Sequence, residues 1–216
     1  MKKCTIIIPT MWFHVEKLKL MLSIYNDIQS VGEILIVDND STKTPELSFS
    51  KVRLIGDGTN LFVNPSWLLG VKEAKFESVV LVNDDIIIKD NLNSLFENII
   101  CILCEGRIVG ADVTCYTNVE SKLALRKRPV KNKLSMGYGY GVFMFVKKST
   151  FLNTPIPNDI KVWYGDHILY YKNEAWCFSG VKIETAMRGT TSRINLSGVA
   201  RKEKMAFYKY LKLQKV

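Results

Sequence analysis

The 216-residue sequence has no apolar run as long as ten residues. This excludes a membrane-spanning helix, which needs about 20 apolar residues. The first apolar stretch, residues 4–8, is too short for a signal peptide and ends at Pro9. Only five cysteines are present, and this odd number suits a reducing cytoplasm better than a disulfide framework. Linkers, repeats and low-complexity tracts are also missing, so we expect a single domain over residues 1–216.

Glycine-rich phosphate-binding motifs are absent as well. No GxGxxG follows the first predicted strand, and no GxxxxGK[ST] occurs anywhere. The chain therefore lacks the phosphate-binding loop of dinucleotide-binding and P-loop proteins. One class of enzyme that this absence leaves open is a sugar-nucleotidyltransferase. Such an enzyme is expected to carry a glycine- and arginine-rich loop after the first strand, where this chain reads PTMWFHVEK.

The net charge of +9 is concentrated in two segments. Residues 122–133 and residues 201–215 each contain six basic side chains. Such clusters attract phosphate groups in nucleic acids, anionic membranes or nucleotides. A non-catalytic basic nucleic-acid-binding module is therefore a second alternative. We find no RRM, KH or helix-turn-helix signature, and we expect no nucleic acid as partner.

The C-terminal segment, residues 205–216, has the pattern of a basic amphipathic helix. Three roles stay open for it: peripheral membrane contact, docking on the domain, or the start of a linker.

Cys101 and Cys104 have CxxC spacing within an apolar, helix-like run. We expect both to be core thiols, and a redox or zinc role is the less favoured interpretation.

Strand and helix patterns alternate along the first 85 residues. Short apolar runs predict strands at residues 4–9, 33–40, 51–58 and 78–85, and apolar residues spaced by three or four predict helices at 15–28 and 65–74. This order indicates an α/β fold with a parallel sheet covered by helices. The pattern then loosens, with helices expected at 92–104 and 165–173. We therefore expect a nucleotide-binding half (about residues 1–90) and a mixed half (about 91–216).

Polar residues follow three of the predicted strands: Pro9-Thr10, Asp38-Asn39-Asp40 and Asn83-Asp84-Asp85. In open α/β sheets, ligands bind at the carboxyl ends of the strands. Each polar segment alone is also compatible with a turn, and that interpretation is strong for DNDS. It is weaker for NDD, because apolar runs flank it on both sides and adjacent carboxylates repel each other. A divalent metal with a diphosphate would neutralise both aspartates, and Mn²⁺ or Mg²⁺ prefers such oxygen ligands.

The ordered motifs TIIIPT, EILIVDNDS, LVNDDIII, GVFMFVKKSTF and WYGDHILYY resemble those of GT-A-fold glycosyltransferases. The likeness covers residues 5–171 and is greatest to the large inverting family 2, with its bacterial and viral rhamnosyl- and glucosyltransferases. It implies a single Rossmann-like domain with a mainly parallel central sheet flanked by helices, and a smaller mixed acceptor-side portion. It also implies metal-dependent, inverting transfer of a hexose or deoxyhexose from a nucleotide-diphosphate sugar, with UDP-sugar favoured, to a glycan or lipid-linked sugar.

On the donor side, the resemblance implies that Pro9 and Thr10 border the nucleotide. Asp38 resembles the acidic residue that contacts the base or ribose, with Asn39 beside it. The segment NDD resembles the DxD-type motif and begins here with Asn83.

The same resemblance places Asp84 near the ribose or sugar and assigns the metal to Asp85. Asp166 stands in the position of the catalytic base, with Trp163 and Tyr164 in the acceptor wall. Many relatives have a histidine near the metal, where this chain reads ETAMRGTTS. Arg188 in that segment is a candidate phosphate-binding cation, because guanidinium matches phosphate in a bidentate manner.

Overall fold

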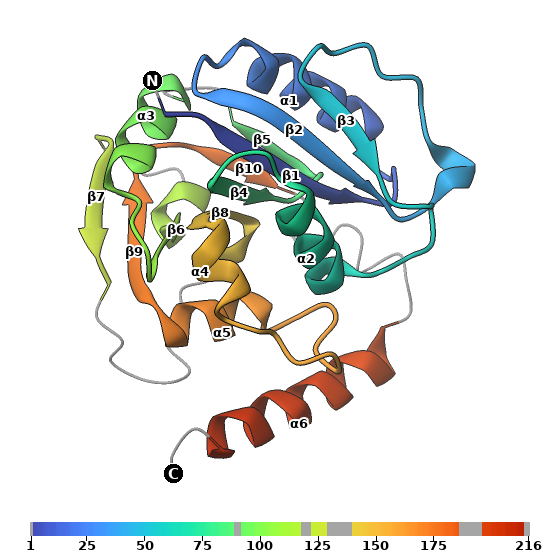
Figure 1. Cartoon of the computed structure of the whole chain (residues 1–216), viewed down its shortest axis with the longest axis vertical. Helices are drawn as coiled ribbons and strands as arrows, with labels where there is room; N and C mark the ends of the chain where they lie inside the picture. The colour runs from blue at the N-terminus through green and yellow to red at the C-terminus, as the bar shows by residue number, and fades with distance from the viewer. Residues whose placement is uncertain (1, 89–91, 118–121, 129–139, 186–195, 214–216) are drawn as a thin grey trace.

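The computed structural model describes residues 2–88, 92–117, 122–128, 140–185 and 196–213. In this part of the chain an eight-stranded sheet has the order β3-β2-β1-β4-β8-β6-β9-β7, and β10 pairs with β5 separately (Figure 1). The strands are β1 Cys4–Thr10, β2 Val31–Asp38, β3 Val52–Ile55, β4 Ser78–Val82, β5 Ile86–Ile88, β6 Arg107–Ala111, β7 Ala124–Lys127, β8 Phe143–Lys147, β9 Glu174–Ser179 and β10 Ile183–Thr185. The helices are α1 Val15–Asp27, α2 Val63–Glu73, α3 Leu92–Ile102, α4 Lys148–Leu152, α5 Gly165–Lys172 and α6 Ser197–Leu213.

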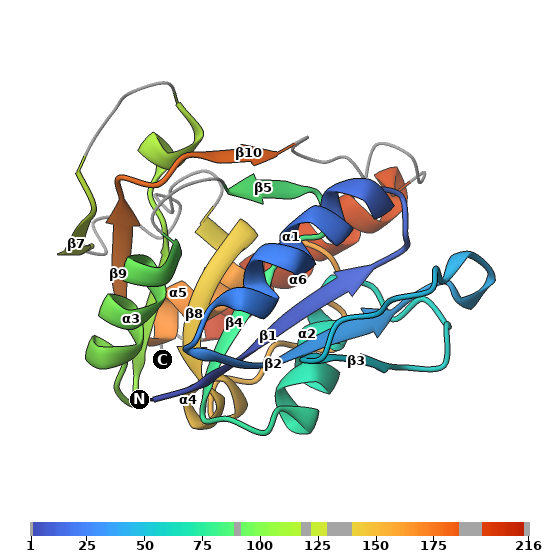
Figure 2. The same cartoon turned by 90° about the horizontal axis from the view of Figure 1, so that it is seen from above.

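The first half of the chain forms a parallel sheet. Strand β1 lies between β2 and β4, β3 is outermost, and all three pairings are parallel. Helices α1 and α2 cover opposite faces of these strands (Figure 2). Successive β1 side chains therefore enter different cores: Ile6 and Ile8 join the cluster that contains α1, and Ile7 joins the one that contains α2. This two-sided burial explains why the strands are apolar throughout.

The second half extends the same sheet. Strand β8 pairs antiparallel with both β4 and β6, β9 is parallel to β6, and β7 forms the edge. Phe96 of α3 packs against Phe143 and Phe145 of β8, with ring centroids 6.0 and 5.2 Å apart. The two halves thus share one sheet, and each of the two main hydrophobic clusters contains residues from both halves. The expected α/β class, with a mainly parallel central sheet flanked by helices, is confirmed.

Helix α6 lies outside the sheet, at the end of the molecule opposite α1 (Figure 1). Its inward side chains Phe207 and Leu211 form a small core with Ile160 and Ile168. The docking interpretation of the C-terminal helix is therefore confirmed for this inward face.

Among the helices described, none is both long and apolar enough to cross a bilayer.

One expectation about side-chain environment needs correction. Cys101 and Cys104 are exposed, not core thiols. The buried stripe of α3 runs through Leu95, Phe96 and Ile99, and the helix ends at Ile102, so both thiols fall outside the packed face. An apolar run alone did not reveal this, because the run continues past the end of the helix.

The first basic cluster is partly neutralised by the protein itself. In β7, Arg126 contacts Asp112 at 2.6 Å and Lys127 contacts Glu174 at 2.8 Å. These ion pairs reduce the positive charge that the described part of this cluster offers to an anionic partner.

Candidate functional site

The carboxyl ends of β1, β2 and β4 meet, as the polar strand ends predicted. Thr10 ends β1, and its Cα partner in the neighbouring strand is Asp38 at the end of β2. The Thr10 hydroxyl donates a 2.6 Å hydrogen bond to Asp84 Oδ2 and accepts one from the Trp12 backbone N–H. Thr10 therefore links the aspartate pair after β4 to the first strand. Pro9, one residue earlier, lies within β1.

Asp84 is a buried carboxyl, with 7% of its surface exposed. Its pKa is raised to about 6, chiefly by burial; the Thr10 hydrogen bond lowers the pKa, and the neighbouring Asp85 charge raises it. The charged form is thus poorly stabilised by the protein alone. A cation beside Asp84 would favour ionisation.

Asp85 is also buried, with 4% of its surface exposed. Its Oδ2 accepts a 3.2 Å hydrogen bond from Thr185 Oγ1 on β10, while Oδ1 has no hydrogen-bond partner within the described chain. Buried polar atoms without partners are uncommon and require an explanation. An unpaired carboxylate oxygen beside a second carboxyl fits a divalent cation that prefers oxygen ligands.

The described residues contain no cluster of three or more His, Cys, Asp or Glu side chains placed to hold a metal. Two adjacent carboxylates would therefore leave most of the coordination shell to phosphate oxygens and water. This is the usual situation for Mg²⁺ bound together with a phosphate-containing substrate.

Asp38 is held by the protein. Its Oδ1 accepts hydrogen bonds from Trp12 Nε1 at 2.8 Å and from the Asp40 N–H at 2.9 Å, and its Oδ2 accepts one from Thr44 Oγ1. Asn39 is engaged as well, because its Oδ1 accepts from the Leu61 N–H at 3.0 Å. The DNDS segment therefore does form a turn. It also fixes the Trp12 ring beside the carboxyl end of β1.

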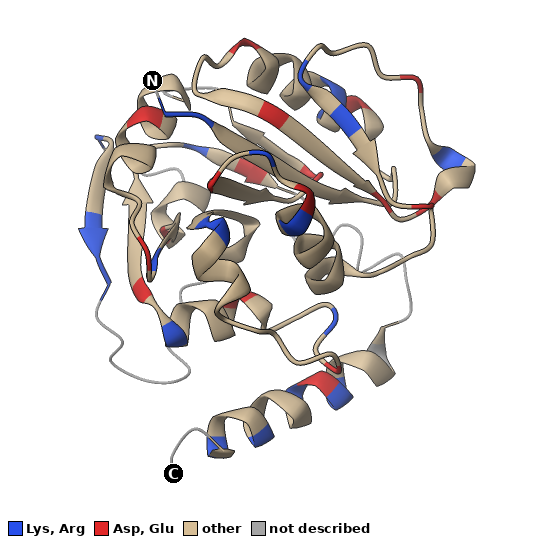
Figure 3. Cartoon of the chain, viewed as in Figure 1, with Lys and Arg blue, Asp and Glu red and all other residues tan. Residues whose placement is uncertain are grey.

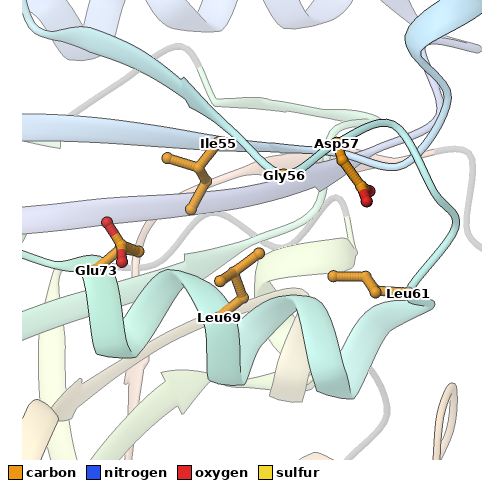
Figure 4. A pocket seen from close by; sticks show the side chains of 6 residues that line it. All are labelled: Ile55, Gly56, Asp57, Leu61, Leu69 and Glu73. Carbon is orange, nitrogen blue, oxygen red and sulfur yellow. The ribbon is translucent and has the colours of Figure 1, made fainter.

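A shallow hollow of about 490 Å³ lies beside this turn, between the end of β3 and α2 (Figure 4). Its lining side chains are Ile55, Gly56, Asp57, Leu61, Leu69 and Glu73. A Cβ added to Gly56 would lie 3.0 Å from the Asp38 carbonyl oxygen, so one lining residue of the hollow packs closely against the Asp38 backbone. Because three apolar side chains and two carboxylates line the hollow, it suits an uncharged group better than a phosphate.

Asp166 lies in the first turn of α5. The helix cap is Tyr164, whose backbone is left-handed (φ 64°), and Asp166 Oδ1 accepts a 2.9 Å hydrogen bond from the His167 N–H. Asp166 is therefore not the N-cap residue, although it does satisfy one of the free backbone donors of the helix start. His167 Nδ1 lies 3.0 Å from the same oxygen.

The segment of residues 140–142 connects Asp166 with the aspartate pair. A Cβ added to Gly141 would lie 2.6 Å from Asp166 Oδ2, so only glycine allows this close approach. The next residue, Val142, accepts a 3.1 Å hydrogen bond from the Asn83 N–H. Asn83 and Asp166 therefore contact two adjacent residues of the same short segment, Val142 and Gly141 respectively.

Two residues that the sequence did not single out hold the loop before Asp166. Asn64 of α2 donates to the Ile160 carbonyl at 2.9 Å and to the Trp163 carbonyl at 3.3 Å. Glu203 of α6, only 1% exposed, accepts backbone N–H bonds from Lys161, Val162 and Trp163 at 2.8–2.9 Å. Glu203 is the one acidic residue in a basic helix, and this was the sequence feature that could have identified it.

The expected acceptor wall is partly packed. The Tyr164 ring stacks on Phe207 of α6, with centroids 4.7 Å apart. Arg188, the candidate phosphate-binding cation, lies outside the described residues.

No family model and no curated protein matches the chain. Among solved structures, it is similar to a crystal structure of S. aureus TarS residues 1–349, with a TM-score of 0.52 and 15% identity over 81% of this chain and 57% of that one. A second TarS crystal structure gives a TM-score of 0.53 and 16% identity, over 84% of this chain and 36% of that one. The chain thus spans at most 57% of these structures. TarS is a glycosyltransferase, and a likeness at this level of identity supports a GT-A-like fold and no particular family.

Proposed function

We propose that this chain is a glycosyltransferase that moves a hexose or deoxyhexose from a nucleotide-diphosphate sugar to a hydroxyl of a glycan or lipid-linked sugar. The observation that carries the proposal is the buried Asp84–Asp85 pair at the carboxyl end of β4, whose Asp85 Oδ1 has no hydrogen-bond partner among the described residues. In a GT-A-like fold this edge of the sheet is where a ligand binds. UDP-sugar is the favoured donor.

The donor would lie along the carboxyl ends of β1, β2 and β4. Asp85 would hold Mn²⁺ or Mg²⁺, which when bound supplies Lewis-acid stabilisation of the charge on the leaving diphosphate. Thr10 orients the Asp84 carboxyl toward this edge through its 2.6 Å hydrogen bond. Asp38 would contact the base or ribose through the remaining capacity of Oδ2, while it keeps Trp12 in place.

The acceptor would lie on the side of α5. Asp166 would take the proton of the attacking hydroxyl, as a general base within hydrogen-bond reach of it. Its Oδ1 is already bound to the His167 N–H, which leaves Oδ2 beside Gly141 for the proton. A single base opposite the leaving group gives inversion at the anomeric carbon by direct displacement.

The experiment that tests this function is a screen of UDP-, dTDP- and GDP-sugars with Mn²⁺, read as thermal stabilisation and as nucleotide release. We expect stabilisation by one donor class that needs the metal, since a ligand of the folded state stabilises by RT ln(1 + [L]/Kd). Asp85→Asn should abolish the metal-dependent part. The exposed Asp27→Asn, which makes the same chemical change at the end of α1, should retain it.

Two results would contradict the proposal. One is the absence of metal-dependent stabilisation by every nucleotide sugar. The other is stabilisation by single-stranded DNA alone, which would favour the nucleic-acid-binding alternative.

A further inference from the structure

Helix α6 has two chemically different faces. On the inward face, Glu203 binds three backbone N–H groups of residues 161–163, and Phe207 and Leu211 enter a small hydrophobic core. These contacts fix the rotation of the helix about its axis. The side chains that remain on the outward face are therefore held in the solvent by the fold itself.

The outward face is strongly basic. Its exposed cations are Arg201, Lys202, Lys204, Lys209 and Lys212. Glu203 is the one acid in the helix and points inward, so no acidic side chain of α6 offsets this charge. Figure 3 shows Lys and Arg (blue) at intervals along the length of α6.

Large apolar side chains lie among these cations. Met205 is 67% exposed, Leu213 65% and Tyr208 40%. At about 100° per residue, Arg201, Lys209 and Lys212 lie within about 40° of Met205 around the helix axis. The centre of the outward face is thus an apolar side chain with cations on both sides.

We propose that the outward face of α6 binds the surface of an anionic lipid membrane. A helix that lies in the membrane interface combines Lys and Arg, for the negative lipid headgroups, with apolar side chains that enter the acyl boundary. Nucleic acid would account for the cations but not for exposed Met205 and Leu213, because neither offers an aromatic ring for base stacking. A planar lipid surface can also meet the whole outward face, about 25 Å long at 1.5 Å per residue.

This surface is independent of the proposed glycosyl transfer. It uses no residue of the candidate site, and its test requires neither donor nor metal. Failure of one proposal therefore leaves the other unaffected.

The test is cosedimentation of the full chain with two kinds of vesicle, phosphatidylcholine alone and phosphatidylcholine mixed equally with phosphatidylglycerol. We expect binding to the anionic vesicles only. The triple variant Arg201→Gln, Lys209→Gln, Lys212→Gln should bind roughly a hundredfold more weakly, since each basic residue near the surface contributes roughly fivefold. The control variant Lys2→Gln, Lys3→Gln, Lys182→Gln removes the same charge from exposed positions outside α6 and should bind like the wild type.

A second variant tests the apolar part. Met205→Ser with Leu213→Ser keeps every charge and should leave a weaker binding that salt removes completely. Both α6 variants change exposed side chains, so their thermal unfolding should match the wild type; the double variant also keeps the test valid if the triple variant unfolds.

Three outcomes would overturn the proposal. These are no sedimentation with anionic vesicles, equal loss of binding in the triple and control variants, and full release from the vesicles by single-stranded DNA at the same phosphate concentration. The last outcome would mark the surface as a general polyanion site.

Discussion

The Asp84 carboxyl combines deep burial with a hydrogen bond from Thr10, and these act on its pKa in opposite directions. Burial dominates and places the pKa at about 6. The folded protein therefore holds this proton between about pH 4 and pH 6, where the unfolded chain has released it. Stability then falls as the pH rises through this window, by on the order of 2–3 kcal/mol at its upper end.

Asp84→Asn should remove this pH dependence, because the amide keeps an oxygen for Thr10 and carries no charge. We expect the difference in unfolding free energy between variant and wild type to grow from pH 4 to pH 7, in favour of the variant. Urea unfolding at several pH values measures it. Asp27→Asn is the control, and a difference that stays constant with pH would show that Asp84 ionises normally.

The Asp166 carboxyl is tested by the substitution that keeps its shape. Asp166→Asn can still accept the His167 N–H but cannot take a proton. Under the proposed function, transfer should fall by roughly 10²–10⁴-fold while donor affinity stays nearly unchanged. Initial rates with the acceptor found by a glycan screen, together with calorimetry of the donor, measure the two effects.

The matched control for Asp166 is Asp159→Asn, an exposed carboxylate seven residues earlier in the chain. It should keep full activity. Loss of transfer in Asp159→Asn, with full activity in Asp166→Asn, would move the base to Asp159.

Among the elements, α6 and the loop of residues 160–164 are linked by the carboxylate of Glu203. Glu203→Ala would leave three partly buried backbone N–H groups without their acceptor. An unsatisfied buried polar group costs about 1–3 kcal/mol, so we expect a loss of unfolding free energy of about this size. The exposed Glu46→Ala should change stability by less than about 0.5 kcal/mol.

Equal stability of Glu203→Ala and Glu46→Ala in urea would contradict this account. It would mean that water replaces the carboxylate, and that α6 is held by Phe207 and its apolar neighbours alone.

Most of these elements could be predicted from the sequence, because hydrophobic periodicity reports directly on burial. The stripe through Leu18, Leu22 and Tyr25 predicted α1, and all three side chains are buried. The apolar run of β5 was expected to be strand-like, but β10 and its pairing with β5 were not predicted, since a three-residue antiparallel pair leaves no distinct period. Strand β7 was hidden for a related reason, because three of its four residues are exposed and two are charged.

The candidate site was predictable only in part. Thr10, Asp38 and Asp84 follow apolar strands, so their meeting at one edge of the sheet follows from parallel topology. Asn64 and Glu203 contact backbone groups 96–99 and 40–42 residues away in the chain. Such contacts depend on how the elements pack in three dimensions, and no local pattern reports them.

At the level of the whole molecule, the direct pairing of β4 with β8 makes the two halves one unit. The larger hydrophobic cluster contains Ile6 of β1 together with Phe143 and Phe178 of the second half. We therefore expect one cooperative unfolding transition. Tryptophan fluorescence and far-ultraviolet circular dichroism should give the same midpoint in urea.

Separate midpoints for the two signals would contradict this expectation. They would show that parts of the chain unfold independently of one another. The mutational free energies predicted above would then refer to one half at a time.

The Glu203 contact also has a consequence for the order in which the protein acquires its shape during synthesis. Strands β1 to β4 with α1 and α2 consist of residues made early, and can assemble while translation continues. The loop of residues 160–164 cannot adopt its final form until residue 203 has left the ribosome, because that carboxylate binds three of its backbone N–H groups. A nascent chain arrested before α6 should therefore resist protease within its first 85 residues and be cut between residues 160 and 164.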